Sequence, residues 1–263
     1  MIQSDPYLSS LAAWREKRLR NLKAADGWLN IIGRWPLDAG PMTLGSGSGN
    51  DIVLSAGPET LGTLLQEASG DVIFTPADGS AAIRIEPASK HYPKFTAGGL
   101  LLEIMTVGDE TSLRVRDPAS TAPDRLAPIE FFPPDPRWRI VADWVDYAAP
   151  QQITVATTRD IDTEVEVTHK AVFILDGRTL ELIATHGTPQ APQFVIRDLT
   201  SRDSTYPASR FVYGEDVTAN SIVLDFNKAI NPPCAFTDFA VCPLPPPENV
   251  LPIRIEAGEK WPH

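Results

Sequence analysis

The C-terminal part of the chain constrains its fold most, because it combines many prolines with many large apolar side chains. Seven prolines fall between Asn231 and Pro252. The same region carries side chains that favour burial, namely Phe226, Phe236, Phe239, Ile253 and Ile255. Disordered proline-rich tails lack such apolar content. We therefore expect an extended segment that docks on the rest of the protein.

The same region holds an ordered set of short motifs. Asp225–Asn227 reads D-F-N, Asn231–Ala235 reads N-P-P-C-A, Cys242–Asn249 reads C-P-L-P-P-P-E-N and Ala257–Lys260 reads A-G-E-K. This order resembles the signature of a bacterial and archaeal family catalogued as domain of unknown function 1684. The resemblance implies a shared fold over the second half of the chain, and it implies no activity.

Composition narrows the function classes. With 263 residues the chain can form two compact units, and 25 prolines with 17 glycines favour turns and extended segments over long helices. A net charge of −11 disfavours non-specific binding to nucleic acid or to an anionic membrane. We find no apolar run of the length that a membrane span needs, and we expect a cytoplasmic protein. Two cysteines make no disulfide framework, so we expect thiols.

Helical spacing of apolar residues after Pro6 predicts a helix over about residues 6–25, within an N-terminal segment 1–27. This helix carries the densest basic cluster of the chain: Arg15, Lys17, Arg18, Arg20 and Lys23. The cluster is either a solvated face that pairs with acidic surface of the same protein or a docking face for an anionic partner.

Short apolar runs separated by turn signals predict a first antiparallel, sandwich-like β unit over residues 28–117. Within it, Leu44–Leu54 resembles the forkhead-associated sandwich, in which a glycine-containing turn precedes an N-D-I-x-L strand. The arginine that binds phosphate in that family is replaced here by Ser46. We therefore expect no phosphopeptide binding, because no guanidinium is present to anchor the phosphate.

A proline-rich connector over residues 118–136 leads into a second antiparallel unit over residues 137–263. Asp176-Gly177 between two alternating runs is a strong hairpin signal. The succession of strands predicts a meander that curls into a barrel or half-barrel, and such barrels can hold one small ligand. The fold class is thus mainly β, with an N-terminal helix, two β units and a proline-rich C-terminal segment that wraps over the second sheet.

The sequence allows several interpretations of the two cysteines. Cys234 and Cys242 are too far apart for a C-x-x-C motif, and they can be small buried hydrophobes or, with His169 and His186, part of a four-ligand metal site. Cys234 can also be a nucleophile with one of these histidines as its base. Asp225, Asn227 or Asn231 would then orient that histidine. We expect neither a metal nor a cofactor.

The best-populated polar group of the sequence is the set of candidate ligand-binding residues: Arg210, Asp225, Asn227, Asn231, Cys234 and Tyr206. It is either a structural hydrogen-bond network or a pocket in which Arg210 recognises an anion. The resembled family usually shows a glycine and a basic residue where this chain has Arg202-Asp203, and a glycine where it has Ser209 before Arg210, so this chain departs from the family pattern at that turn.

The sequence is compatible with three alternative functions. The first is a protein that binds a small polar or anionic ligand near the N-P-P-C motif. The alternatives are an enzyme that uses Cys234 or a carboxylate such as Asp225 or Glu248, and a structural or interaction protein. The sequence leaves the oligomeric state open.

Overall fold

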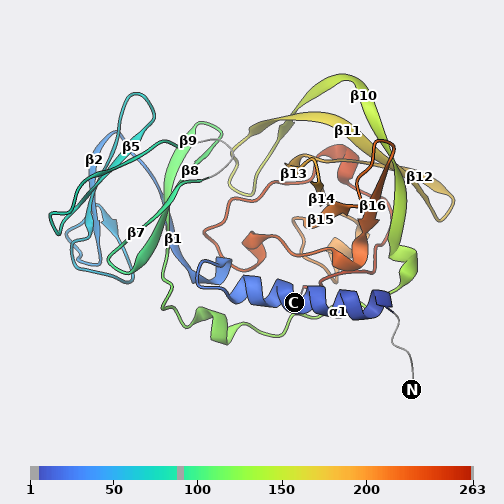
Figure 1. Cartoon of the computed structure of the whole chain (residues 1–263), viewed down its shortest axis with the longest axis horizontal. Helices are drawn as coiled ribbons and strands as arrows, with labels where there is room; N and C mark the ends of the chain where they lie inside the picture. Colours follow the sequence, from blue (N-terminus) through green and yellow to red (C-terminus); the bar gives the residue numbers. More distant parts are fainter. Residues whose placement is uncertain (1–5, 88–91, 262–263) are drawn as a thin grey trace. The chain divides into compact units, whose positions relative to one another are not determined.

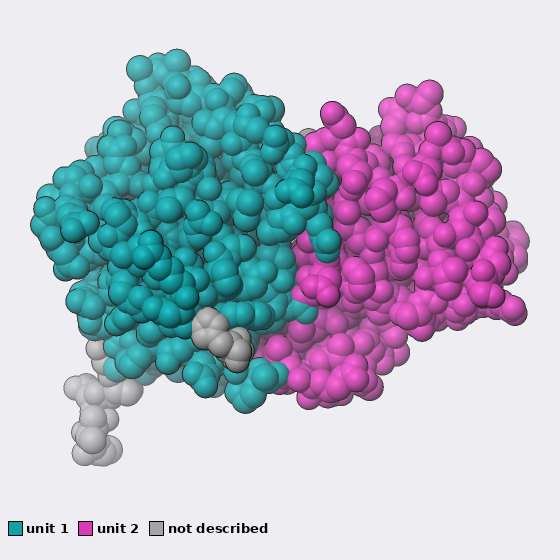
Figure 2. Space-filling model, turned by 180° about the vertical axis from the view of Figure 1, so that it is seen from behind, with its two compact units in different colours: residues 1–18, 127–236, 241–263 teal, residues 19–126, 237–240 magenta. Residues whose placement is uncertain are grey.

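The computed structural model of the protein describes residues 6–87 and 92–261. The chain divides into two compact units, shown in different colours in Figure 2. Unit 1 comprises residues 1–18, 127–236 and 241–263, and unit 2 comprises residues 19–126 and 237–240. The predicted connector contributes residues to both units. Strands dominate both, so the mainly β fold is confirmed.

The long helix α1 spans Pro6–Lys23 and confirms the predicted N-terminal helix, which ends two residues earlier than expected. Proline suits the first turn of a helix because it lacks only an amide hydrogen that has no intrahelical acceptor there. Two members of the basic cluster have partners within unit 1: Arg15 lies 4.2 Å from the centre of the Phe131 ring, and Arg18 pairs with Glu259. Of the helices described, none combines the length and the apolar content needed to cross a bilayer.

Unit 1 is built on one seven-stranded sheet with the order β12-β11-β10-β16-β15-β14-β13. The neighbours in this order are antiparallel. The strands are β10 (Arg139–Val155), β11 (Thr163–Leu175), β12 (Arg178–Ile183), β13 (His186–Thr188), β14 (Ala191–Ile196), β15 (Arg210–Glu215) and β16 (Ser221–Asp225). The hairpin between β11 and β12 turns at Asp176 and Gly177, both at positive φ, as the predicted two-residue turn requires.

The two outer strands of this order are consecutive in the chain. β12 ends at Ile183 and β13 begins at His186, so two residues carry the chain from one end of the sheet to the other. The sheet is therefore strongly curled, and β10 and β11 arch over the C-terminal segment (Figure 1). Among the described residues no ladder joins β12 to β13 or β14, so the half-barrel is the form observed and the sheet does not close.

The C-terminal segment packs into the core of this sheet, as predicted. Leu251, Ile253, Ile255 and Ala257 alternate with more exposed residues and join the core of unit 1 with Phe226. They fill the interior in which a barrel of this size would hold a ligand. The expectation was wrong for Phe239, which is 37% exposed. It lies in residues 237–240, which group with unit 2 and not with the sheet.

Unit 2 consists of two sheets around a shared apolar core, with the orders β1-β9-β8-β7 and β3-β2-β4-β5-β6. The strands of the first are β1 (Ile31–Pro36), β7 (Lys94–Ala97), β8 (Leu100–Val107) and β9 (Glu110–Arg116). Those of the second are β2 (Gly40–Gly45), β3 (Ile52–Val53), β4 (Gly62–Gln66), β5 (Val72–Pro76) and β6 (Ile83–Ile85). All neighbours are antiparallel except β2 and β3. The Ser46 hydroxyl donates to the Gly57 carbonyl across the glycine-rich loop.

Candidate functional site

Arg210, at the start of β15, lies in the interior of unit 1 and is 1% exposed. Its Nη2 donates to Asp198 Oδ1 at 2.8 Å and to the Ile255 carbonyl at 3.0 Å, and its Nη1 donates to the Ala257 carbonyl. Asp198 in turn accepts the amide hydrogen of Ile255 at 2.7 Å. The guanidinium therefore connects the turn after β14 to the C-terminal segment.

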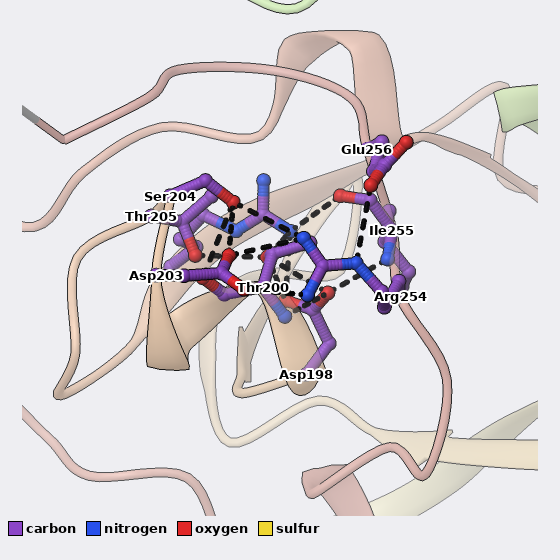
Figure 3. Close-up of polar contacts among 9 residues, drawn as sticks. Asp198, Thr200, Asp203, Ser204, Thr205, Arg254, Ile255 and Glu256 are labelled. Atoms are coloured by element: carbon purple, nitrogen blue, oxygen red, sulfur yellow. Dashed lines mark hydrogen bonds and ion pairs between the residues drawn. The ribbon is translucent and has the colours of Figure 1, made fainter.

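The turn that follows Asp198 is the short helix η4 (Leu199–Arg202), and the Asp198 side chain caps it by accepting from the Thr200 amide. At the outer side of this turn Asp203 forms a two-pronged pair with Arg254, at 2.9 and 3.0 Å. Figure 3 shows Asp198 and Asp203 on the turn with Arg254 and Ile255 opposite. Asp203 thus carries an ion pair from this turn to the C-terminal segment.

Asp225 and Asn227 form a second cluster, with Tyr7 of α1. Tyr7 donates its hydroxyl hydrogen to the Asp225 carboxylate at 3.0 Å, and Asn227 Nδ2 donates to the Tyr7 oxygen at 2.9 Å. Asn227 also exchanges hydrogen bonds with the backbone of Asp135. Burial and the neighbouring Asp225 carboxylate raise the pKa of Tyr7 well above its usual value. Tyr7 therefore stays protonated and remains a donor.

Asn231 belongs to a third cluster, around a carboxylate that sequence reasoning missed. Glu259 is fully buried and accepts from the backbone amide of Asn231 at 2.6 Å and from Arg18 Nε at 2.9 Å. The preceding Gly258 is at φ +78°, and a Cβ there would lie 2.5 Å from the Ala229 carbonyl oxygen. The A-G-E-K motif thus supplies a glycine for close backbone approach and a carboxylate that binds the helix.

Asn249, in the C-P-L-P-P-P-E-N motif, occupies the seam between β12 and β14. Its side chain is fully buried, donates to the carbonyls of Ile183 and Val195 at 2.9 Å each, and accepts from the Ile183 amide at 2.8 Å. The amide side chain therefore takes the place of a strand pairing that the open sheet lacks. The neighbouring Glu248, a candidate carboxylate, is exposed.

Cys234 and Cys242 lie side by side although eight positions separate them. The Cys234 amide donates to Cys242 Sγ at 3.2 Å, and the Tyr206 hydroxyl donates to the Cys234 carbonyl at 3.1 Å. Both cysteines are thiols. A hydrogen bond from the Cys242 side chain lowers the pKa of the Cys234 thiol, and although burial opposes this, Tyr206 and the charge of Arg159 lower the pKa further.

Two further residues complete this thiol site, which we define as Cys234, Cys242, Tyr206, Arg159 and Trp261. Arg159 is exposed in the loop after β10. Trp261 meets the Tyr206 ring edge to face, with ring centres 5.0 Å apart. No sequence motif marked either residue, because Arg159 is a single arginine in a turn and Trp261 follows the A-G-E-K motif.

The two histidines take other partners. His169 stacks on Trp144 with ring centres 4.8 Å apart and pairs with Asp146 at 2.6 Å, and His186 shares a hydrogen bond with Thr185. Within residues 6–87 and 92–261, no three His, Cys, Asp or Glu side chains gather as metal ligands. The described contacts therefore contain no Cys-Cys-His-His site, and they place no histidine against Cys234.

The predicted candidate residues thus separate into four places. Arg210 joins Asp198, Asp225 and Asn227 join Tyr7, Asn231 joins Glu259, and Tyr206 joins Cys234. Buried hydrogen bonds of this kind hold the extended segment, because each one left unmade would cost the desolvation of its polar group. Cys234 and Tyr206 differ from the other four in keeping part of their surface exposed.

Comparison with known proteins places these motifs in a family. No curated protein matches the chain. A solution NMR structure of an uncharacterized protein from Haloarcula marismortui is 30% identical, with a TM-score of 0.43, and the match covers 52% of this chain and 78% of that one. These comparisons do not confirm the forkhead-associated likeness of residues 44–54. The model of the family described as a protein of unknown function (DUF1684) matches residues 124–260, and the chain belongs to that family.

Proposed function

We propose that the protein binds a small anionic molecule at the thiol site. The observation that carries this proposal is the difference in exposure among the candidate residues. Arg210, Asp225, Asn227 and Asn231 are each at most 2% exposed and hydrogen-bonded within the protein. Cys234 and Tyr206 are partly exposed, so a ligand can reach them.

The charge of the thiol site supports an anionic ligand. The protein carries a net charge of −11, yet the exposed Arg159 places a positive charge close enough to act on Cys234. A guanidinium binds a carboxylate or phosphate through paired hydrogen bonds. Tyr206 adds a hydroxyl, and Trp261 adds an aromatic surface beside it. Arg159 thus takes the role that the sequence suggested for Arg210.

A melting-temperature screen tests this proposal. The probes are small carboxylates and phosphate esters, each added to the wild-type protein, to Arg159→Ala and to a control, Arg178→Ala. Arg178 is exposed at the start of β12. A ligand present at 100 times its Kd stabilises the folded state by about 2.7 kcal/mol. We expect at least one probe to raise the melting temperature of the wild type and of Arg178→Ala but not of Arg159→Ala. Equal shifts in all three proteins, or none, would count against the site.

A second function, an enzyme with Cys234 as its nucleophile, is favoured by the lowered pKa of this thiol. A thiolate attacks electrophiles directly, so a lowered pKa reduces the need for a histidine base. The probe is p-nitrophenyl acetate. Release of p-nitrophenol that is lost in Cys234→Ala but kept in the control Arg178→Ala supports an enzyme, whereas equal release from all three proteins argues against one. We place either activity in the cytoplasm, where a reducing environment keeps Cys234 a thiol.

A further inference from the structure

The loop after β10 holds Cys242 next to Cys234. Cys242 donates its amide hydrogen to Thr158 Oγ1 at 3.2 Å, and its carbonyl accepts from the Thr158 amide at 2.9 Å. An isolated bridge between Thr157 and Pro243 continues this pairing. Cys234 lies in the short helix η6 (Pro233–Ala235), whose geometry directs its amide at the Cys242 sulfur. The two thiols are therefore held together by backbone contacts on both sides.

The two thiols differ in access to solvent. Cys242 is 1% exposed, whereas Cys234 is only partly buried. A small oxidant dissolved in water therefore reaches Cys234 first. Oxidation of cysteine proceeds through the thiolate, and it is selective for thiols that are both accessible and easily deprotonated. Cys234 meets the first condition by its position, and Cys242 is placed to react with it next.

We propose that Cys234 and Cys242 form an oxidation site for small hydroperoxides, in which Cys234 is oxidised and Cys242 closes an intramolecular disulfide. This inference does not depend on the proposed anionic ligand.

Oxidation of the two thiols by a hydroperoxide proceeds in two steps. The Cys234 thiol releases its proton to solvent, and its thiolate attacks the terminal oxygen of the hydroperoxide. An S–O bond forms, the O–O bond breaks, and the leaving alkoxide or hydroxide takes up a proton from solvent to depart as an alcohol or water. Cys234 is then a sulfenic acid. The Cys242 sulfur attacks the Cys234 sulfur, so the S–S bond forms, the S–O bond breaks and water leaves with the Cys242 proton. Two thiols have lost two electrons, and one hydroperoxide has gained them.

The neighbours of Cys234 assist the first step. The Cys242 side chain, the Tyr206 hydroxyl and the Arg159 charge all stabilise its thiolate, and together they outweigh burial and lower its pKa. The Arg159 charge also favours the leaving oxygen, on which negative charge develops as the O–O bond breaks. Arg159 and Tyr206 therefore have positioning and electrostatic roles, and Cys234 is the reacting residue.

Treatment of the full chain with equimolar hydrogen peroxide, in the presence of dimedone to trap sulfenic acid, tests the proposal by intact mass and peptide mapping. In the wild type we expect the loss of two hydrogens, a disulfide between Cys234 and Cys242, and reversal by dithiothreitol. In Cys242→Ser we expect a dimedone adduct on Cys234. In Cys234→Ser we expect Cys242 to stay reduced.

Three results would overturn the proposal: a wild type that keeps both thiols, a disulfide only between two chains, or oxidation of Cys242 in Cys234→Ser as fast as in the wild type. If a serine variant fails to fold, the wild-type peptide map still decides the first two of these outcomes, and the corresponding alanine variant replaces the serine variant for the third. Arg159→Ala and Tyr206→Phe add a readout of the positioning role. Both should slow oxidation several-fold at neutral pH. At alkaline pH, where every thiol is ionised, Tyr206→Phe should approach the wild-type rate, whereas Arg159→Ala should stay slower because it lacks the charge that stabilises the leaving oxygen. Unchanged rates at neutral pH would refute the roles assigned to them.

Discussion

Replacement of Asn249 by alanine is expected to destabilise unit 1 strongly. The change removes three hydrogen bonds at the seam of the sheet and leaves the amide and carbonyl of Ile183 and the carbonyl of Val195 without that partner. Each lost bond costs about 1 kcal/mol, and more where the orphaned group stays dry. We therefore expect a loss of about 3 kcal/mol or more, which corresponds to about 6–12 °C in melting temperature for a unit of this size.

Differential scanning calorimetry measures this change, with Asn220→Ala as the matched control. Asn220 is exposed in the turn before β16, and the contact described for it beyond its own turn, with the Trp144 amide, uses its backbone carbonyl. The control should melt within about 2 °C of the wild type, since exposed substitutions rarely exceed about 0.5 kcal/mol. If Asn249→Ala melts with the control, the amide does not hold the seam and the argument for the C-terminal segment as part of the sheet fails.

Three further predictions concern a buried ion pair of unit 1, a buried carboxylate of unit 2 and the C-terminal segment. Arg210→Ala should lower the free energy of unfolding, measured in urea, by about 3–5 kcal/mol, because it leaves the buried Asp198 carboxylate without its charged partner. Arg254→Ala removes an exposed ion pair and should lower it by at most about 1 kcal/mol. Equal losses in the two variants would contradict this prediction. Burial opposes ionisation of Glu103, but Arg114 and Arg116 outweigh it and lower its pKa. The ionised Glu103 carboxylate therefore stabilises unit 2 fully above its unfolded pKa of about 4.3, and this stabilisation is lost as the pH falls through its folded pKa. Glu103→Gln should lower the melting temperature of unit 2 at pH 7, and by progressively less below about pH 4. A difference in melting temperature that does not change with pH would refute this prediction. A chain cut after Ile230 should be insoluble or unfolded, because burial of Leu251, Ile253 and Ile255 is worth on the order of 5–9 kcal/mol; a soluble product with an unchanged melting temperature would show the segment to be an appendage.

The main features of the fold could be predicted because local patterns determine them. Pro6 and the apolar spacing after it mark α1, and Asp176-Gly177 marks a turn that needs two residues at positive φ. The C-terminal segment was predicted to pack because apolar residues accompany its prolines. The position of Phe239 was not predictable, since apolar character alone does not say which residue of an irregular loop faces the core.

The clusters of the site were only half predictable, because their partners are far apart in the chain. The sequence singled out Arg210, Asp225 and Asn231, but not Asp198, Tyr7 or Glu259, with which they pair. Such pairs leave no local signal: Arg18 and Glu259 are 241 positions apart. The nearness of the two thiols was hidden for a similar reason, since a spacing of eight in an irregular segment does not define a geometry. One indication was available, because each family motif carries at least one residue that proves to be buried and polar or a thiol.

The rate of alkylation of Cys234 by iodoacetamide as a function of pH tests the reactivity of the thiol site most directly. Alkylation requires the thiolate, so the midpoint of the rate profile reports the pKa of Cys234. We predict a midpoint below the value of about 8.5 for an ordinary thiol, and a shift of that midpoint toward higher pH in Cys242→Ala, which loses the hydrogen bond that most lowers it. A midpoint at or above the ordinary value, or one that Cys242→Ala leaves unchanged, would contradict the account.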